Sequence, residues 1–250
     1  MFFKKKNSNI LEWNYNMVNR PSNFSVEDYY VKASKHLPDW FSKLPPSSLG
    51  GNSFTEILNV RTCPSFLEVF KNSFLFRAPC DIEIEYSKHG FRYLIHPESD
   101  SFLSIDTHTK AGEKSQMGPY WDKDMLNIKM MPRLIFKPKN RKLKAIFLPP
   151  TFWNPRHFLQ PIPGVLELLP DYPMVMNLNF FVDTKGLKQS ESRVEFIKCD
   201  EPLALIYFPD GLPKFEKTDI MWYAKKRFIG DWIYKLKDYE KREKTKKCPF

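Results

Sequence analysis

Residues 74–96 read FLFRAPCDIEIEYSKHGFRYLIH, and this stretch decides the expected fold class. Apolar and acidic residues alternate in its middle, so Ile82, Ile84 and Tyr86 would share one face of a strand. Residues 87–90, SKHG, then supply a short turn before the next apolar run, as in a β-hairpin. We therefore predict two antiparallel strands here, with the acidic face toward solvent.

Short apolar runs separated by turn residues recur along most of the chain. The composition also indicates many short strands. With 21 prolines and only 9 glycines, it favours short elements with rigid connections over a helical bundle. The segment 106–127 is polar and is predicted to be a long loop. Further strands are predicted at 74–79, 102–106, 132–138, 142–149, 164–170, 172–182, 192–198 and 202–208.

Helical segments are predicted before and after these strands. Ser25 and Asp28 are spaced almost as in a capping box, which favours a helix over 26–35. A second helix is predicted over 62–74, where a proline falls in the first turn. From residue 219 to about 244, apolar residues recur at helical spacing and predict a long amphipathic helix.

The order of these elements predicts an α+β fold. Its core would be a β-sandwich or barrel of about ten strands, with short N-terminal helices and one long C-terminal amphipathic helix. A chain of 250 residues is long enough to bury a sizeable core. We expect an irregular arm over 1–24, a β-rich domain over 25–215, and a C-terminal helix and basic tail over 216–250 packed on that domain.

The net charge of +10 lies mostly at the two ends of the chain. Three lysines at positions 4–6 and an excess of six positive charges within 225–247 account for nearly all of it. A basic end could hold an acidic protein surface or nucleic acid through non-specific electrostatics. The alternative is a solvated helix with a solubilising tail.

Several function classes find no motif in this sequence. It has no glycine-rich phosphate loop, no GxSxG nucleophile turn and no zinc pattern among its four widely spaced cysteines. No apolar run reaches 18 residues, so we expect no membrane span. The start, MFFKKKNSN, lacks the apolar region of a signal peptide, so we expect no secretion by that route.

The segment 150–163 is predicted to be a rigid loop, rich in proline and aromatic residues, that joins two core strands. Rigid aromatic side chains and arginine are favoured binding anchors because little entropy is lost when they bind. The side chains expected to be presented for binding are Phe152, Trp153, Arg156, His157, Phe158 and Gln160.

An alternative use of the same loop is a metal centre. His96 and Glu98 are two residues apart and could share one face of a strand, with His157 as a distant third ligand. Two histidines and one carboxylate are the ligand set of non-haem Fe(II) oxygenases. Arg156 would then bind the carboxylate of a co-substrate, although Pro97 is unfavourable in a central strand.

Two further pairs of side chains, each with at least one acidic residue, allow both a chemical and a structural interpretation. Asp106 and His108 could act together as a general base, or could cap a turn. Glu167 and Asp171 flank Pro170 and could bind a cation, or could lie in a solvated turn.

The chain also resembles an uncharacterised family, a domain of unknown function, of marine tailed phages and bacteria. The similar stretches are LPDWFSKLP, RTCPSFLEVF, FLFRAPCDIEIE, KAIFLPPTFWNP, GVLELLPDYP, MNLNFFV and CDEPLALIYF. They follow the family's order over roughly residues 36–210. The resemblance implies a phage protein that acts in the host cytoplasm or on the virion, and it adds another phage protein to the expected partners.

A second resemblance concerns the late strands alone. GVLELLPDYPMVMNLNFF and FIKCDEPLALIYF look like the last strands of the dUTPase and dCTP-deaminase barrel. Glu167 stands where that pattern has an aspartate, and Leu205 stands where it has a glutamine. The serine-rich phosphate motif has no counterpart, so the resemblance implies a shared barrel and not its chemistry.

The leading expectation is a phage-encoded binding or assembly protein without catalysis and without a cofactor. One alternative is a non-haem Fe(II) oxygenase-like enzyme that uses His96, Glu98 and His157. The other is a nucleotide-binding barrel similar to dUTPase.

Overall fold

The computed structural model describes residues 9–15, 25–45, 47–49, 56–58, 60–96, 103–106, 124–153 and 158–218. Of these residues 52% lie in strands and 14% in helices, so the protein is mostly β and the predicted α+β class is wrong. The helices in this part of the chain are short. The long C-terminal helix expected within 216–250 lies outside the described residues, which end at residue 218.

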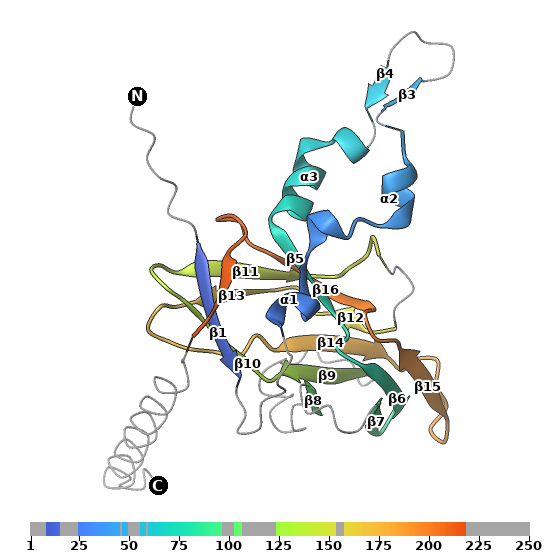
Figure 1. Cartoon of the computed structure of the whole chain (residues 1–250). Coiled ribbons are helices and arrows are strands. Elements are labelled where there is room, and N and C mark those ends of the chain that lie inside the picture. Colours follow the sequence, from blue (N-terminus) through green and yellow to red (C-terminus); the bar gives the residue numbers. More distant parts are fainter. Residues whose placement is uncertain are drawn as a thin grey trace, which may run out of the picture.

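A five-stranded antiparallel sheet forms one layer of the fold (Figure 1). Its edge strands are β13 and β2, and its central strand is β16. In spatial order the strands are β13 (Gly164–Leu168), β11 (Leu143–Leu148), β16 (Pro202–Tyr207), β5 (Ser73–Arg77) and β2 (Tyr30–Lys32).

Three further sheets lie around the same core. A four-stranded sheet holds β12 (Gln160–Pro161), β14 (Leu178–Asp183), β9 (Met125–Pro132) and β8 (Leu103–Asp106). A three-stranded sheet holds β15 (Ser192–Ile197), β6 (Asp81–Ser87) and β7 (Gly90–His96). The last holds β10 (Leu134–Pro138), β1 (Ile10–Tyr15) and β17 (Lys214–Lys217), with β1 and β17 parallel.

Two paired chain segments pass together from one sheet into another and so make a corner of the sandwich. β5 pairs with β16 in the five-stranded sheet, and the same chain segments continue as β6 and β15 in a three-stranded sheet. The link keeps its backbone pairing, because the Ala78 amide donates to the Glu201 carbonyl (2.8 Å) and the Asp200 amide donates to the Ala78 carbonyl (2.9 Å). Bent strands of this kind close a β-sandwich at its ends.

The main core lies between the sheets and receives side chains from each of those four. Burial of such side chains stabilises the fold by about 1.5–3 kcal/mol apiece. Six of its fully buried members, from six strands, are Leu11, Phe76, Ile84, Phe136, Phe180 and Ile206.

A smaller apolar cluster covers the outer face of the five-stranded sheet. It is formed with α2 (Asp39–Lys43) and α3 (Pro64–Lys71), which lie above that sheet in Figure 1. β5 is therefore buried on both faces: Phe74 and Phe76 enter the main core, whereas Leu75 packs with Phe70 of α3 in the smaller cluster. This double burial explains the continuous apolar run FLF.

The helix predicted over 26–35 is broken after one turn. α1 (Val26–Tyr29) has the predicted capping box between Ser25 and Asp28, but β2 follows at once and pairs with β5. A 3-10 turn over Ala33–Lys35 then leads to α2. The aromatic and β-branched residues at 30 and 31 are buried on opposite faces of the sheet, so tertiary packing prevails over the helical start.

The strands that were predicted are largely confirmed, but several of the observed strands were not predicted. The hairpin of β6 and β7 has the expected register, with Ser87 opposite Gly90. The expected arm at 1–24 contains β1, the middle strand of its sheet. β2, β9, β12 and β17 were not predicted as strands, nor were the short strands at 47–49 and 56–58, and the helix expected over 62–74 is shorter, as α3.

The remaining elements are small. β3 (Ser47–Leu49) and β4 (Glu56–Leu58) form a two-stranded pair, and a 3-10 turn over Val60–Thr62 precedes α3. None of the described helices is both long enough and apolar enough to span a membrane.

Candidate functional site

Phe152 and Trp153, two of the expected binding anchors, contact the helical cluster. The Phe152 ring lies edge-on to Phe66 of α3, with 4.5 Å between ring centroids. The Trp153 indole donates a hydrogen bond to the His36 carbonyl (2.5 Å), and the Trp40 indole donates to the Phe152 carbonyl (2.8 Å). These contacts fix the segment after β11 onto α2 and α3.

Phe158 and Gln160 lie elsewhere, on the side of the four-stranded sheet. The Phe158 ring stacks on Tyr86 of β6, with 5.7 Å between centroids, and packs against the main core. Gln160 is exposed on β12, opposite Phe181. Arg156 and His157 lie outside the described residues, so the structure separates the described members of the expected loop into two groups.

His96, the first ligand of the iron alternative, is the exposed last residue of β7 and pairs with Asp81. The Phe158 ring contacts Tyr86 of β6. Tyr86 lies five residues from Asp81, the residue opposite His96, and this separation corresponds to about 17 Å along a strand. Glu98 and His157 lie outside the described residues. Among the residues that are described, no group of three histidine, cysteine, aspartate or glutamate side chains could hold a metal ion.

The structure describes three of the four residues in the pairs Asp106–His108 and Glu167–Asp171. Asp106 ends β8 opposite Lys129 of β9, while His108 lies outside the described residues. Glu167 of β13 forms an ion pair with Lys142 (3.4 Å) on the solvent side. Asp171 is exposed in the turn that follows β13.

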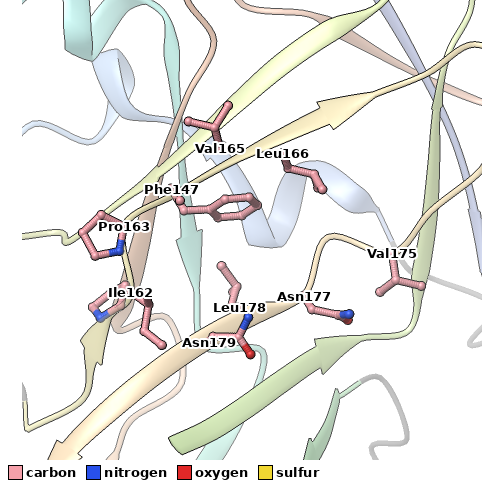
Figure 2. A pocket seen from close by; sticks show the side chains of 11 residues that line it. Phe147, Ile162, Pro163, Val165, Leu166, Val175, Asn177, Leu178 and Asn179 are labelled. Atoms are coloured by element: carbon pink, nitrogen blue, oxygen red, sulfur yellow. The ribbon is translucent and has the colours of Figure 1, made fainter. Parts of the chain in front are cut away.

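A pocket of about 300 Å³ opens where the five-stranded and four-stranded sheets separate (Figure 2). Phe147 of β11 lies at its centre in the view, with Leu178, Asn177 and Asn179 below it. The opposite wall comes from β13 and from the segment that joins β12 to it. The residues of that wall are Pro161, Ile162, Pro163, Gly164, Val165 and Leu166.

Asn177 and Asn179 are the polar side chains of this otherwise apolar pocket. The Oδ1 atom of each is buried and has no hydrogen-bond partner among the described residues. A buried acceptor oxygen without a partner costs about 1–3 kcal/mol, and such atoms are rare in folded proteins. Two of them beside one pocket mark a place where a ligand can supply the missing hydrogen bonds.

The sequence carried a signal for these two residues that the strand prediction did not use. The run 172–182 was predicted as a core strand, yet Asn177 and Asn179 interrupt it at alternate positions. Alternate residues project on one side of a strand, so the two amides are neighbours on the same side. An amide pair within an apolar run is therefore a pointer to a site.

The edge of the five-stranded sheet borders the pocket. β13 pairs with β11 alone among the described strands, so its other edge is open. Val165 at the middle of β13 is 67% exposed, the largest exposure among the large apolar residues of the described chain. An exposed apolar residue on an open strand edge favours pairing with another chain.

Comparison with protein-family models, with curated proteins and with solved structures found no match.

Proposed function

We propose that this chain is a binding or assembly protein that takes up an extended segment of a partner protein along the open edge of β13. One apolar side chain of that segment would enter the pocket beside Phe147. The unpartnered Oδ1 atoms of Asn177 and Asn179 in the pocket wall carry the proposal.

The size of the pocket favours a side chain over a larger ligand. Small-molecule and cofactor sites typically measure about 300–1,000 Å³, and this pocket lies at the lower limit. An inserted side chain would leave the rest of the partner on the edge strand. Strand addition of this kind draws affinity from backbone hydrogen bonds and specificity from pockets for alternate side chains.

The chemistry of the pocket defines the partner segment. The wall residues Phe147 and Leu166 require an apolar side chain, and each asparagine amide offers both donors and an acceptor. A peptide backbone carries an N–H donor at every residue except proline, so it can supply the donors that the two Oδ1 atoms lack. The resemblance to a phage family makes another phage protein the first partner to examine.

The test begins with random nine-residue peptides selected on the immobilised full chain. The dissociation constant of the best selected peptide is then measured by fluorescence anisotropy for the wild type and for the double variant Asn177→Ala with Asn179→Ala. Two lost hydrogen bonds of about 0.5–1.5 kcal/mol each predict binding weakened by about 5- to 150-fold.

Stability in denaturant separates this role from a merely structural one. Removal of the two buried Oδ1 atoms that lack a partner should leave the free energy of unfolding unchanged or raise it. The control is Phe196→Ser. It removes from β15 an apolar side chain that is about as exposed as Val165 but lies outside the proposed site, and it should not alter the dissociation constant. The proposal fails if no peptide is selected, or if the double variant binds as tightly as the wild type.

A further inference from the structure

A second pocket, of about 470 Å³, lies at the opposite edge of the five-stranded sheet, next to β2. Its walls come from β2, the 3-10 turn that follows it, and the start of β17. Trp153 of the expected binding loop contacts this lining through its hydrogen bond to the His36 carbonyl, whereas none of these residues lines the proposed peptide site. The lining residues are Glu27, Tyr30, Val31, Lys32, Lys35, His36, Phe74, Pro213, Lys214 and Phe215.

Three lysines surround this pocket. Lys32 lies on β2, Lys35 ends the 3-10 turn, and Lys214 begins β17, so three separate elements contribute a lysine to the lining of one pocket. All three side chains are exposed, and none forms an ion pair with another described residue. Glu27 is the acidic residue of the lining, which leaves a net charge of two positive units from these four side chains.

His36 indicates the same electrostatic environment. Partial burial lowers the pKa of this imidazole, and the nearby positive charges of Arg77 and Lys35 lower it further. The ring is therefore neutral at pH 7 and adds hydrogen-bonding groups without charge. Arg77 forms an ion pair with Asp200 (3.3 Å), and the negative charge of Asp200 offsets part of the effect of Arg77 on the pKa of His36.

The floor of the pocket is aromatic. Phe74 and Phe215 stack with their ring centroids 4.6 Å apart, and the Tyr30 ring lies edge-on to Phe215 at 6.0 Å. Pro213 continues this apolar surface. A ligand that fits the pocket must therefore combine an apolar body with an anionic end.

We propose that this pocket binds a small organic phosphate, with the phosphate among the three lysines and the apolar body on the Phe215 side. A phosphate monoester carries about 1.5–2 negative charges at pH 7, which matches the net charge of the rim. A carboxylate carries only one. The three lysines line the same pocket from different elements, so the proposal expects them to contact different oxygens of one tetrahedral group.

The test uses phenyl phosphate, benzoate, benzyl alcohol and inorganic phosphate in calorimetric titrations of the full chain. Phenyl phosphate should bind with a dissociation constant below about 1 mM, more tightly than benzoate and inorganic phosphate, and benzyl alcohol should not bind measurably. Added salt should weaken the binding of phenyl phosphate, because the lysines are exposed to solvent.

The variant that tests the site is the triple substitution Lys32→Gln, Lys35→Gln and Lys214→Gln. It should lose at least about 10-fold in affinity for phenyl phosphate, equal to the loss of one good charge-assisted contact. Because the three side chains are exposed, the melting temperature should change little. The matched control is Lys185→Gln, which removes an exposed lysine from the turn after β14 and should bind as the wild type does.

Three results would overturn the proposal. One is equal binding of benzoate and phenyl phosphate, and another is an unchanged affinity in the triple variant. The third is binding of a single-stranded oligonucleotide without binding of phenyl phosphate, which would indicate a nucleic-acid surface instead. The pocket does not depend on the peptide site, so the Asn177→Ala, Asn179→Ala double variant should bind phenyl phosphate normally.

Discussion

Tyr30 shows how a single side chain combines packing gain with polar cost. Its ring lies among Phe76, Phe136 and Phe215, with centroids 5.1, 5.4 and 6.0 Å away. Aromatic pairs at these distances contribute about 0.5–1.5 kcal/mol each beyond the area they bury. The hydroxyl, however, is buried without a hydrogen-bond partner among the described residues.

Tyr30→Phe should therefore keep the packing and remove the cost. We expect the free energy of unfolding to rise by about 1 kcal/mol, measured by urea denaturation at pH 7. Tyr30→Leu is the comparison, because it also removes the hydroxyl but loses the three aromatic contacts, and it should be less stable than the wild type. A loss of stability in Tyr30→Phe would mean that the hydroxyl has a partner.

The same residue predicts how stability changes at high pH. Burial raises the pKa of the Tyr30 hydroxyl well above its usual value of 10.0, so in the folded protein it stays protonated while in the unfolded chain it ionises. The contribution of this hydroxyl to the free energy of unfolding is fully present below pH 10. Above pH 10 it falls by about 1.4 kcal/mol per pH unit. Tyr30→Phe should remove that slope in denaturation curves at pH 10–12, and an unchanged slope would contradict the burial.

Sequence patterns predicted single residues well where the partner is a neighbour in the chain. Ile82, Ile84 and Tyr86 are buried as the alternation required, because one strand decides which face each residue occupies. The contacts of Phe152 could not be predicted from such a local pattern. Its contacts are with Phe66 and Trp40, far away in sequence, and only the assembled fold brings them together.

At the scale of elements, the hairpin of β6 and β7 depends on one glycine. Gly90 has φ +148°, a conformation that side-chain-bearing residues rarely adopt, and no atom would obstruct an added Cβ. Gly90→Ala should therefore cost about 1–2 kcal/mol through backbone strain alone. The measurement is the midpoint of thermal unfolding.

Gly186 supplies a matched control for that substitution. It also has open space where a Cβ would stand, but its φ lies outside the positive range. Gly186→Ala should then be neutral or slightly stabilising, because alanine restricts the unfolded chain. If both substitutions cost the same, the strain at Gly90 is not the cause.

Elements failed to match the prediction where local and global preferences disagree. The capping box at Ser25 and Asp28 starts a helix, and both side-chain hydrogen bonds of the box are formed. After one turn, pairing of Tyr30 to Lys32 with β5 extends the five-stranded sheet and ends the helix. No local rule in the sequence reveals that a sheet edge is available at that point.

At the scale of the whole molecule, the first described strand joins two segments that are far apart in the sequence. β1 lies between β10 from the middle of the chain and β17 from the end of the described part. Leu11 and Trp13 of β1 are buried in the main core. A short strand near the start of the sequence, with little periodicity, therefore joins segments that the sequence alone gave no reason to place together.

Because β1 connects three distant segments, the described domain should unfold as one unit. We predict that Trp13→Ala lowers the free energy of unfolding by about 3–5 kcal/mol, as other large-to-small core changes do. Circular dichroism and intrinsic fluorescence should still give coincident single transitions in urea. The Lys217 ammonium lies 5.4 Å from the Trp13 ring centre, so Lys217→Ala is the control and should cost less than about 1 kcal/mol. A second transition in Trp13→Ala would show that the sheet of β10, β1 and β17 folds apart from the rest, and the placement of β1 at the centre of one cooperative core would then be wrong.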